Sequence, residues 1–225
     1  MLDRRLQSIF DLVEPCECCV DIGCDHGYLA LQLLVQHKAK SVVAADMREL
    51  PLKRAQDTFF ENHVTEGISF VLSDGIASVN ENLDAAVIAG MGVDNVKKII
   101  TQDLLRFRKM KQVIVQVNKN TEEMRRWMIN QGFEIEAEKM SYIRYYYTVV
   151  RYRYTETKNR YSDFEYRFGP LLLREKPPIL VEYLEKTLAY QMELLNKLKS
   201  KPQKYKATEK LIKCLKQEVD KETTV

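Results

Sequence analysis

The sequence of 225 residues lacks any long uninterrupted apolar run, although 45% of its residues are hydrophobic. A membrane-spanning helix needs about 20 consecutive apolar residues, so we expect no membrane partner. Residues Met1–Arg5 lead into a charged helical pattern instead of the apolar stretch of a secretory signal. We therefore expect a cytoplasmic globular protein with one main domain and an appendage.

Cysteine is scarce, and four of the five cysteines crowd into one segment, at Cys16, Cys18, Cys19 and Cys24. An odd number on one predicted strand does not resemble a disulfide framework. Cys16 and Cys19 form a single CxxC, but no second pair follows at the spacing of a zinc site. We interpret these residues as buried strand thiols and expect no bound metal ion.

Charge is nearly balanced overall but differs between the two parts of the chain. Residues 1–150 hold 18 basic and 21 acidic side chains, whereas residues 151–225 hold 17 and 11. Net charges of −3 and +6 result, and a basic tail suits an anionic partner such as nucleic acid. An exposed helical face is also often this basic for solubility alone.

Short runs rich in Val and Ile alternate with helical patterns, which is typical of a parallel sheet covered on both faces. Two later strands are joined too closely for a parallel crossover, so we expect an antiparallel hairpin at the sheet edge. Such an edge distinguishes class I methyltransferases from classical dehydrogenases. The predicted strands are Cys18–Ile22, Ser41–Ala45, Ile68–Leu72, Ala85–Ala89, Gln112–Val117, Glu134–Met140 and Arg144–Tyr154. The predicted helices are Leu2–Leu12, Tyr28–Gln36, Leu50–Asn62, Asp94–Ile100 and Thr121–Asn130.

Beyond residue 160 the pattern changes. Tyr161–Lys176 is predicted to be irregular, and Pro177–Pro178 then open a helix that Pro202 ends. A second helix follows, and apolar residues at every third or fourth position predict an antiparallel coiled-coil hairpin. The predicted stripe is Leu180, Leu184, Leu188, Gln191, Leu195 and Leu198 on the first helix and Ala207, Leu211, Cys214 and Leu215 on the second. Its apolar stripe indicates packing or dimerisation, so a monomer and a dimer both stay open. Its lysines favour RNA binding instead: Lys197, Lys199, Lys201, Lys204, Lys206, Lys210, Lys213 and Lys216.

Ligands of open α/β sheets bind beyond the carboxyl ends of the strands. The first predicted strand ends in DIGCDHGY, from Asp21 to Tyr28, which is not the GxGxxG of dinucleotide enzymes. Asp21 and Asp25 would repel a pyrophosphate but tolerate the ammonium and sulfonium groups of S-adenosyl-L-methionine. The string therefore favours a sulfonium cofactor, although a tight turn alone would also explain it.

Acidic residues also follow the next two predicted strands. Asp46, next to Met47, comes 25 residues after Asp21, close to the separation at which an acid binds ribose hydroxyls. Asp74 precedes Gly75, and its carboxylate can accept a hydrogen bond from an adenine amino group. Each acid alone is also explained as a helix cap or a solvated loop residue. Three acids at three successive strand ends predict a nucleoside site.

The last two parallel strands end in a glycine loop and an amide. Gly90-Met91-Gly92 is expected to form a narrow loop in which a planar base fits beside a transferable methyl group. The side chain of Met91 is either a wall of this slot or part of the core. Asn118 follows the fifth strand and is expected, with the carbonyls around Gly90, to orient a base. Lys119 is a predicted phosphate contact.

Together these motifs resemble the bacterial tRNA (adenine-N1)-methyltransferases that modify the adenosine at tRNA position 22. The resemblance spans almost the whole chain, with two departures. Val117 replaces the proline of the family motif Gln-Pro-Asn, and Asp46 stands where relatives carry glutamate. The motifs are Arg4-Arg5-Leu6-Gln7, Asp21–Tyr28, Asp74-Gly75, Ile88–Gly92, Gln116–Asn118 and Phe168–Leu172.

The resemblance implies an α/β fold with two parts. Residues 1–160 are expected to form a Rossmann-like methyltransferase domain that uses S-adenosyl-L-methionine, and residues 161–225 a helical extension. The implied substrate is tRNA. The predicted cofactor-binding residues are Asp21, Gly23, Asp25, His26, Gly27, Asp46, Met47, Asp74, Gly75, Gly90, Met91 and Gly92. The predicted catalytic residues are Asn118, Tyr28 and Met91.

Other side chains are expected to meet the RNA. Arg125 and Arg126, with Lys119 and the C-terminal lysines, are predicted phosphate contacts. Tyr145–Tyr147, with the neighbouring arginines 144, 151 and 153, either stack on bases or belong to the strand core. Two other functions stay open. One is a methyltransferase for a small molecule or a protein, and the other is a noncatalytic RNA-binding protein.

Overall fold

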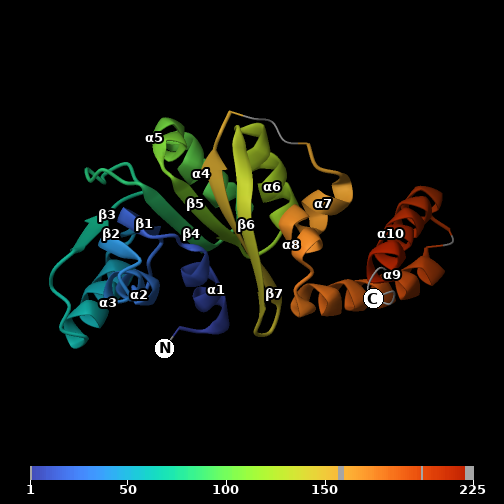
Figure 1. Cartoon of the computed structure of the whole chain (residues 1–225), viewed down its shortest axis with the longest axis horizontal. Coiled ribbons are helices and arrows are strands. Elements are labelled where there is room, and N and C mark those ends of the chain that lie inside the picture. The colour runs from blue at the N-terminus through green and yellow to red at the C-terminus, as the bar shows by residue number, and fades with distance from the viewer. Residues whose placement is uncertain (1, 157–159, 199, 221–225) are drawn as a thin grey trace. The chain divides into compact units, whose positions relative to one another are not determined.

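The structure is a computed structural model that describes residues 2–156, 160–198 and 200–220. The chain divides into two compact units, Met1–Arg160 and Tyr161–Val225, whose elements are labelled in Figure 1. The strands of the first unit are β1 Cys16–Ile22, β2 Ala39–Asp46, β3 Ile68–Leu72, β4 Ala85–Met91, β5 Gln112–Val117, β6 Phe133–Tyr142 and β7 Tyr146–Tyr154. Its helices are α1 Arg4–Leu12, α2 Tyr28–Val35, α3 Glu49–Glu61, α4 Val93–Gln102, α5 Leu104–Lys109 and α6 Thr121–Asn130.

The strands form one seven-stranded sheet in the order β3-β2-β1-β4-β5-β7-β6. The pairs among β1 to β5 are parallel, whereas β7 is antiparallel to both β5 and β6. It follows that β6 runs in the same direction as β5. The predicted Rossmann-like sheet with an antiparallel hairpin at its edge is confirmed.

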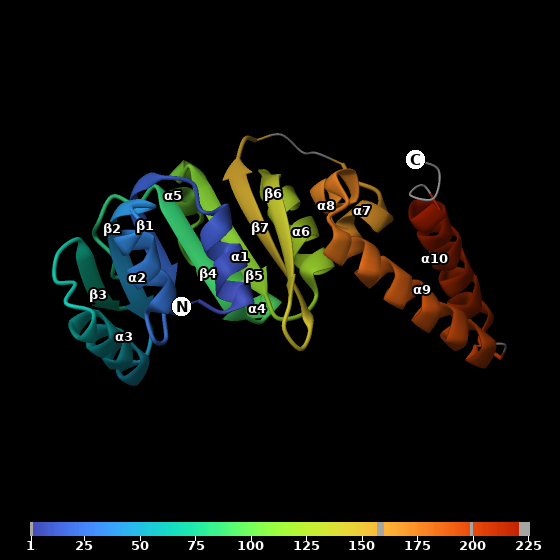
Figure 2. The ribbon, with the colours of Figure 1, turned by 60° about the horizontal axis from the view of Figure 1, so that its bottom comes forward.

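Two layers of helices bury the sheet. Helices α1, α2 and α3 contact one another and the strands on one face, and α4, α5 and α6 form the other layer (Figure 2). Strand β5 is buried along its whole length, and β4 is buried until its last residues. Burial on both faces explains why these strands are continuous apolar runs instead of alternating patterns. Helix α5 was not predicted.

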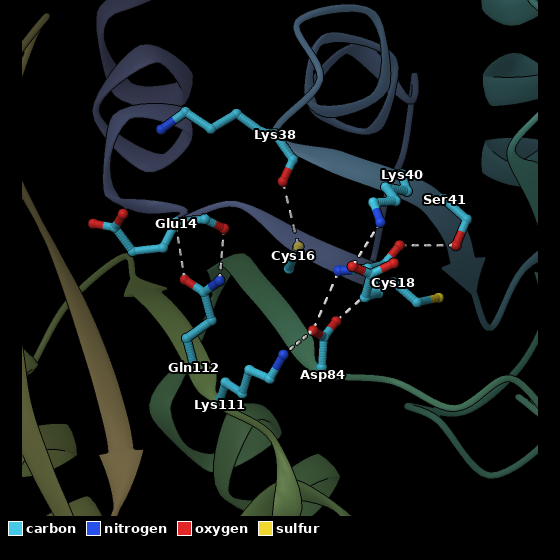
Figure 3. A network of polar contacts seen from close by, with 10 residues as sticks. Glu14, Cys16, Cys18, Lys38, Lys40, Ser41, Asp84, Lys111 and Gln112 are labelled. Carbon is cyan, nitrogen blue, oxygen red and sulfur yellow. Dashed lines mark hydrogen bonds and ion pairs between the residues drawn. The ribbon is translucent and has the colours of Figure 1, made fainter.

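A polar network closes the amino-terminal edge of the sheet (Figure 3). The carboxylate of Asp84 accepts hydrogen bonds from the backbone N–H groups of Cys18 at 2.8 Å and Glu17 at 3.2 Å. The side-chain amide of Gln112 exchanges two hydrogen bonds with the backbone of Glu14, at 2.8 and 2.9 Å. These contacts fix the start of β1 against β4 and β5 and leave the opposite edge for a ligand.

The cysteines of the first unit belong to this buried framework. Cys16, Cys18, Cys19 and Cys24 are all buried free cysteines. The first three lie on β1, as predicted, whereas Cys24 follows that strand. Within the described part of the chain, no three His, Cys, Asp or Glu side chains are grouped so as to hold a metal ion. None of the described helices is long and apolar enough to cross a membrane.

The second unit corrects one prediction. The segment expected to be irregular contains two short helices, α7 Asp163–Phe168 and α8 Pro170–Glu175. Ser162 and Glu165 form a reciprocal capping box at the start of α7, and Gly169, with φ of 100°, separates the two helices. The prediction failed because helices this short carry no apolar periodicity, so the capping pair and Gly169-Pro170 were the only available signals.

Two long helices follow, α9 Pro178–Lys197 and α10 Pro202–Asp220, and they pack against each other. Leu180 and Leu184 of α9 are buried as predicted. In α10 the buried positions are Thr208, Ile212 and Leu215, whereas Ala207 is exposed. Only part of the predicted stripe of α10 is therefore right, and the coiled-coil geometry stays a prediction.

A buried ion pair joins α6 to the sheet. Arg125 and Glu138 are 1% and 0% exposed, and Arg125 Nε donates to Glu138 Oε1 at 2.7 Å. The prediction that Arg125 contacts phosphate is therefore wrong, because its guanidinium lies in the interior. Arg126 is partly exposed and pairs with Glu122 of the same helix.

Breaking this pair should destabilise the protein severely. Glu138→Leu leaves the guanidinium of Arg125 buried without its carboxylate, and we expect the free energy of unfolding to fall by about 3–5 kcal/mol. Urea denaturation at unchanged m-value measures the effect. Glu17→Ala, which removes the exposed Glu17–Lys40 pair, is the control and should cost under about 1 kcal/mol. If Glu138→Leu also lowered the free energy of unfolding by less than about 1 kcal/mol, the buried ion pair would not be needed for stability.

Candidate active-site cleft

A cleft of about 860 Å³ opens at the carboxyl edge of the parallel strands. Its walls come from the segments that follow β1 to β5, from α1 and α4, and from the start of β7. The parallel register explains this gathering, because strands that run in one direction end at one edge. The lining residues are Arg5, Ile22, Gly23, Asp25, Asp46, Met47, Arg48, Ser73, Asp74, Gly75, Ala89, Gly90, Met91, Asn95, Lys98, Ile99, Asn118 and Tyr147.

Gly90 interrupts the ladder between β4 and β5, where the register shifts between Ala89 and Met91. The side chains of Gln116, on β5, and Asn118, just after β5, bind the backbone groups that the bulge removes from the ladder. The N–H of Gly90 donates to Gln116 Oε1 at 3.0 Å, and its carbonyl accepts from Asn118 Nδ2 at 2.7 Å. Met91 and Asn118 are also joined by a backbone hydrogen bond of 3.0 Å.

This arrangement fixes the amide of Asn118. A carbonyl can only accept, so the Gly90 carbonyl must face Nδ2, and Oδ1 becomes the exposed acceptor. The carbonyls around Gly90 were predicted to orient a base directly. The carbonyls of Gly90 and Met91 each accept a hydrogen bond from Asn118, and a direct contact with a base stays a prediction.

Arg5 extends the network to the first helix. Its Nη1 donates to Gln116 Oε1 at 3.0 Å, so that oxygen accepts from both Arg5 and Gly90. Gln116 is fully buried, and its Nε2 donates to the Val117 carbonyl at 2.8 Å. A Cβ at Gly90, whose φ is +76°, would lie 3.1 Å from Arg5 Nη1. Helix α1 is thus part of the cleft wall.

The loop after β1 lies against the side chain of Met91. A Cβ added at Gly23, whose φ is +77°, would lie 2.3 Å from Met91 Cε. The absence of a side chain at Gly23 therefore leaves the space that the Met91 thioether reaches. This contact favours the wall role of Met91 over burial in the core.

Asp46 ends β2 with a buried carboxylate, only 5% exposed. Its Oδ1 accepts from the backbone N–H of Arg48 at 3.0 Å, and the Arg48 guanidinium Nε is 3.6 Å away. Among the described residues, none donates a hydrogen bond to its Oδ2. The acid is anchored by one oxygen and has the other available for a ligand in the cleft.

The other two acidic residues of the cleft are paired with cations from neighbouring helices. Lys98 of α4 donates to Asp74 Oδ2 at 2.8 Å, and this hydrogen bond lowers the pKa of Asp74 below its ordinary value. Arg54 of α3 pairs with Asp25, whose backbone has φ of 46°. The charge of each carboxylate is therefore partly balanced by a neighbouring cation.

Asp21 has the most perturbed environment. It is 5% exposed on β1, and burial raises its pKa to about 7, with the nearby charge of Asp46 acting in the same direction. A hydrogen bond from the backbone N–H of Ala30 opposes the shift. An acid that burial holds partly protonated near neutral pH marks a candidate functional site.

The structure brings most of the predicted residues together but separates some. Eight of the predicted cofactor residues line the cleft, together with Asn118: Gly23, Asp25, Asp46, Met47, Asp74, Gly75, Gly90 and Met91. The predicted residues that lie outside the lining are Asp21, His26, Gly27, Tyr28 and Gly92. The rings of His26 and Tyr28 stack 5.4 Å apart, and Tyr28 is half exposed.

Sequence reasoning missed the cations and one aromatic residue of the cleft: Arg5, Arg48, Lys98 and Tyr147 were not assigned to it. Arg5 belonged to a quoted motif, and Arg48 follows the predicted acid Asp46 closely. The motif and the closeness to Asp46 are signals that point to the cleft for these two residues. Lys98 offered none, because only the packing of α4 brings it to Asp74.

The raised pKa of Asp21 predicts a specific pH dependence of stability. An acid with a higher pKa in the folded state stabilises the fold fully below about pH 4, and that contribution is lost as pH rises through about 7. Between pH 5 and pH 8, the free energy of unfolding should fall by about 2–3 kcal/mol relative to Asp21→Asn, which cannot ionise. Urea denaturation of both proteins at both pH values measures this change. If the difference in free energy of unfolding between the two proteins were the same at pH 5 and pH 8, the pKa of Asp21 would not be raised.

Comparison with known proteins agrees with this architecture. A tRNA (adenine(22)-N(1))-methyltransferase of Bacillus subtilis (strain 168) is 25% identical over 138 residues, which are 61% of this chain and 58% of that protein. A solved Streptococcus agalactiae protein of the NADB-Rossmann superfamily has a TM-score of 0.86 and 26% identity over 97% of both chains. M. capricolum TrmK, solved with S-adenosyl-homocysteine, has a TM-score of 0.82 and 25% identity over 98% of both.

The matches to the curated relatives span 58% to 65% of the length of those proteins. The family model described as TrmK, tRNA (adenine(22)-N(1))-methyltransferase, matches residues 19–221 and so includes most of both units. The chain therefore belongs to the TrmK family of tRNA (adenine(22)-N(1))-methyltransferases.

Proposed function

We propose that this protein transfers a methyl group from S-adenosyl-L-methionine to N1 of the adenine at position 22 of tRNA. The observation that carries the proposal is the cleft itself, in which Asp46, Gly23 and the Gly90 bulge meet at the carboxyl edge of a methyltransferase-type sheet. Family membership supports the reaction and the position of the target base.

The residues of the cleft fit the cofactor. Asp46 Oδ2, to which none of the described residues donates a hydrogen bond, suits a ribose hydroxyl, and Gly23, beside Met91, lines the same cleft. Asp46 lines the cleft and the buried Asp21 lies nearby, and carboxyl groups suit the ammonium and sulfonium groups of S-adenosyl-L-methionine. The M. capricolum relative, solved with S-adenosyl-homocysteine, supports this assignment. When bound, the cofactor supplies an electrophilic methyl group.

Little acid–base chemistry is required of the protein. Adenine N1 has its own lone pair, so transfer needs chiefly alignment of the nitrogen with the methyl carbon and the sulfur. The hydrogen bond from Asn118 Nδ2 to the Gly90 carbonyl supports a role for Oδ1 as the acceptor for the exocyclic amino group of the base. This contact would hold the base in one orientation and favour the positive charge that develops on the ring. Met91 would form one wall of the slot.

We assign tRNA contacts to exposed cations of both units. Lys119, beside Asn118, is exposed, as are the lysines of α10. Lys199 lies outside the described residues. Phosphate binding by such side chains is salt-dependent and independent of base sequence. Location in the cytoplasm follows as a proposal from the tRNA substrate and from the reduced cysteines.

The central test is methylation of a transcribed tRNA with adenine at position 22, by purified protein and methyl-labelled S-adenosyl-L-methionine. We expect incorporation of label, and digestion of the product should yield 1-methyladenosine at that position. A tRNA with guanine at position 22 is the matched control and should stay unlabelled. Tight, salt-dependent tRNA binding without any transfer would instead indicate a noncatalytic RNA-binding protein.

Asp46 offers a test of the cofactor site. Asp46→Asn keeps the size of the side chain but removes the charge, and we expect cofactor affinity to fall by about 1–3 kcal/mol because charged hydrogen bonds are lost. Isothermal titration calorimetry with S-adenosyl-homocysteine measures the change. Glu49→Gln, on the first turn of α3, is the control. Equal affinities for the wild-type and Asp46→Asn proteins would disprove the placement.

Asn118 offers a test of base orientation. In Asn118→Asp the carboxylate cannot donate to the Gly90 carbonyl, so the bulge loses one partner and the acceptor is no longer fixed. We expect kcat to fall roughly 100-fold, as small misplacements of reacting groups do. Cofactor affinity should stay within about threefold of wild type. A wild-type kcat would show that Asn118 does not orient the base.

A further inference from the structure

The β6–β7 hairpin ends at the same edge of the sheet as the cleft. Because β6 runs parallel to β5, its last residue, Tyr142, lies at the edge where β4 and β5 also end. The turn that follows is closed by a hydrogen bond from the Ile143 N–H to the Tyr145 carbonyl at 3.3 Å. Tyr147, at the start of β7, already lines the cleft.

The hairpin tip, defined as residues 142–147, exposes an unusual amount of aromatic surface. Tyr145 is 70% exposed, Ile143 44% and Tyr142 40%. The rings of Tyr142 and Tyr146 lie 4.8 Å apart, so the base of the tip is braced by an aromatic pair. Exposed apolar side chains that are contiguous mark interaction surfaces, and these are beside the opening of the cleft.

Charge indicates what kind of partner the tip fits. The tip contains Arg144 and no acidic residue, and exposed Arg4 and Lys119 flank the same edge. Within the part of the chain that the structure describes, none of these three cations forms an ion pair. Aromatic rings interleaved with cations are typical of single-stranded nucleic-acid sites, where bases stack on the rings and phosphates meet the cations.

We propose that the hairpin tip is an RNA-stacking site, at which an unpaired base next to the target adenine stacks on Tyr145 and its phosphate binds Arg144. The inference rests on the proposed function. Access to adenine N1 requires that the target base leave its stack, which exposes a neighbouring base at the edge of the cleft. Tyr145 then contacts the substrate beside the reacting base without contacting the cofactor.

The test compares variants of Tyr145 in tRNA methylation. Tyr145→Ala should raise KM for transcribed tRNA roughly 5- to 100-fold, the range expected for loss of one stacked base. Tyr145→Phe should retain nearly wild-type KM because it keeps the ring, whereas Tyr145→Leu should behave like Tyr145→Ala. Affinity for S-adenosyl-homocysteine, measured by calorimetry, should stay unchanged in all three.

Phe60→Ala is the matched control. Phe60 is 79% exposed on the last turn of α3. That helix packs on β2 and β3, at the other end of the strand order from β6 and β7. Its KM for tRNA should equal that of the wild type. A wild-type KM for Tyr145→Ala, a Tyr145→Leu protein as good as Tyr145→Phe, or an equal loss in Phe60→Ala would each overturn the stacking site alone. Failure of the wild-type protein to methylate tRNA would overturn the proposed function as well.

Discussion

The break in the ladder between β4 and β5 at Gly90 is the constraint on which the rest of the cleft depends. Gly90 is removed from the ladder, and side chains at the end of β5 pair its N–H and carbonyl instead. Gln116 and Asn118 provide both partners. The same two hydrogen bonds set the geometry of the loop and the orientation of the Asn118 amide. The hydrogen bonds that pair the Gly90 backbone are therefore the same contacts that orient Asn118 for the substrate recognition we propose.

The acidic residues in and near the cleft differ in how their charge is balanced. Asp25 and Asp74 are balanced by cations from α3 and α4, so they contribute little unpaired charge. Asp21 is buried near Asp46, and its main compensation is one backbone hydrogen bond. Protein folds retain such unfavourable groups mainly at functional sites, where a ligand supplies what is lacking. Asp46, with Asp21 nearby, therefore marks the part of the cleft that we propose for a cationic ligand.

Much of this could be predicted from the sequence, because the sheet is built from local signals. Buried parallel strands are recognised as apolar runs. Glycines and acids follow these runs, and because parallel strands end at one edge of the sheet, these residues meet there. The failures arise where tertiary packing decides. Arg125 was predicted to bind phosphate because α6 alone does not reveal that Glu138 of β6 lies beneath it. Arg5 and Lys98 belong to helices, and only their packing brings them to the cleft.

Val117 shows how the structure compensates for a departure from the family pattern. A proline at this position would restrict the backbone through its ring. Here the restriction comes from hydrogen bonds instead: Gln116 Nε2 donates to the Val117 carbonyl, and the Asn118 N–H donates to the Met91 carbonyl. Val117 is itself buried and paired with Met91. The end of β5 is therefore held on both sides of Val117, so the rigidity that Asn118 needs does not depend on proline.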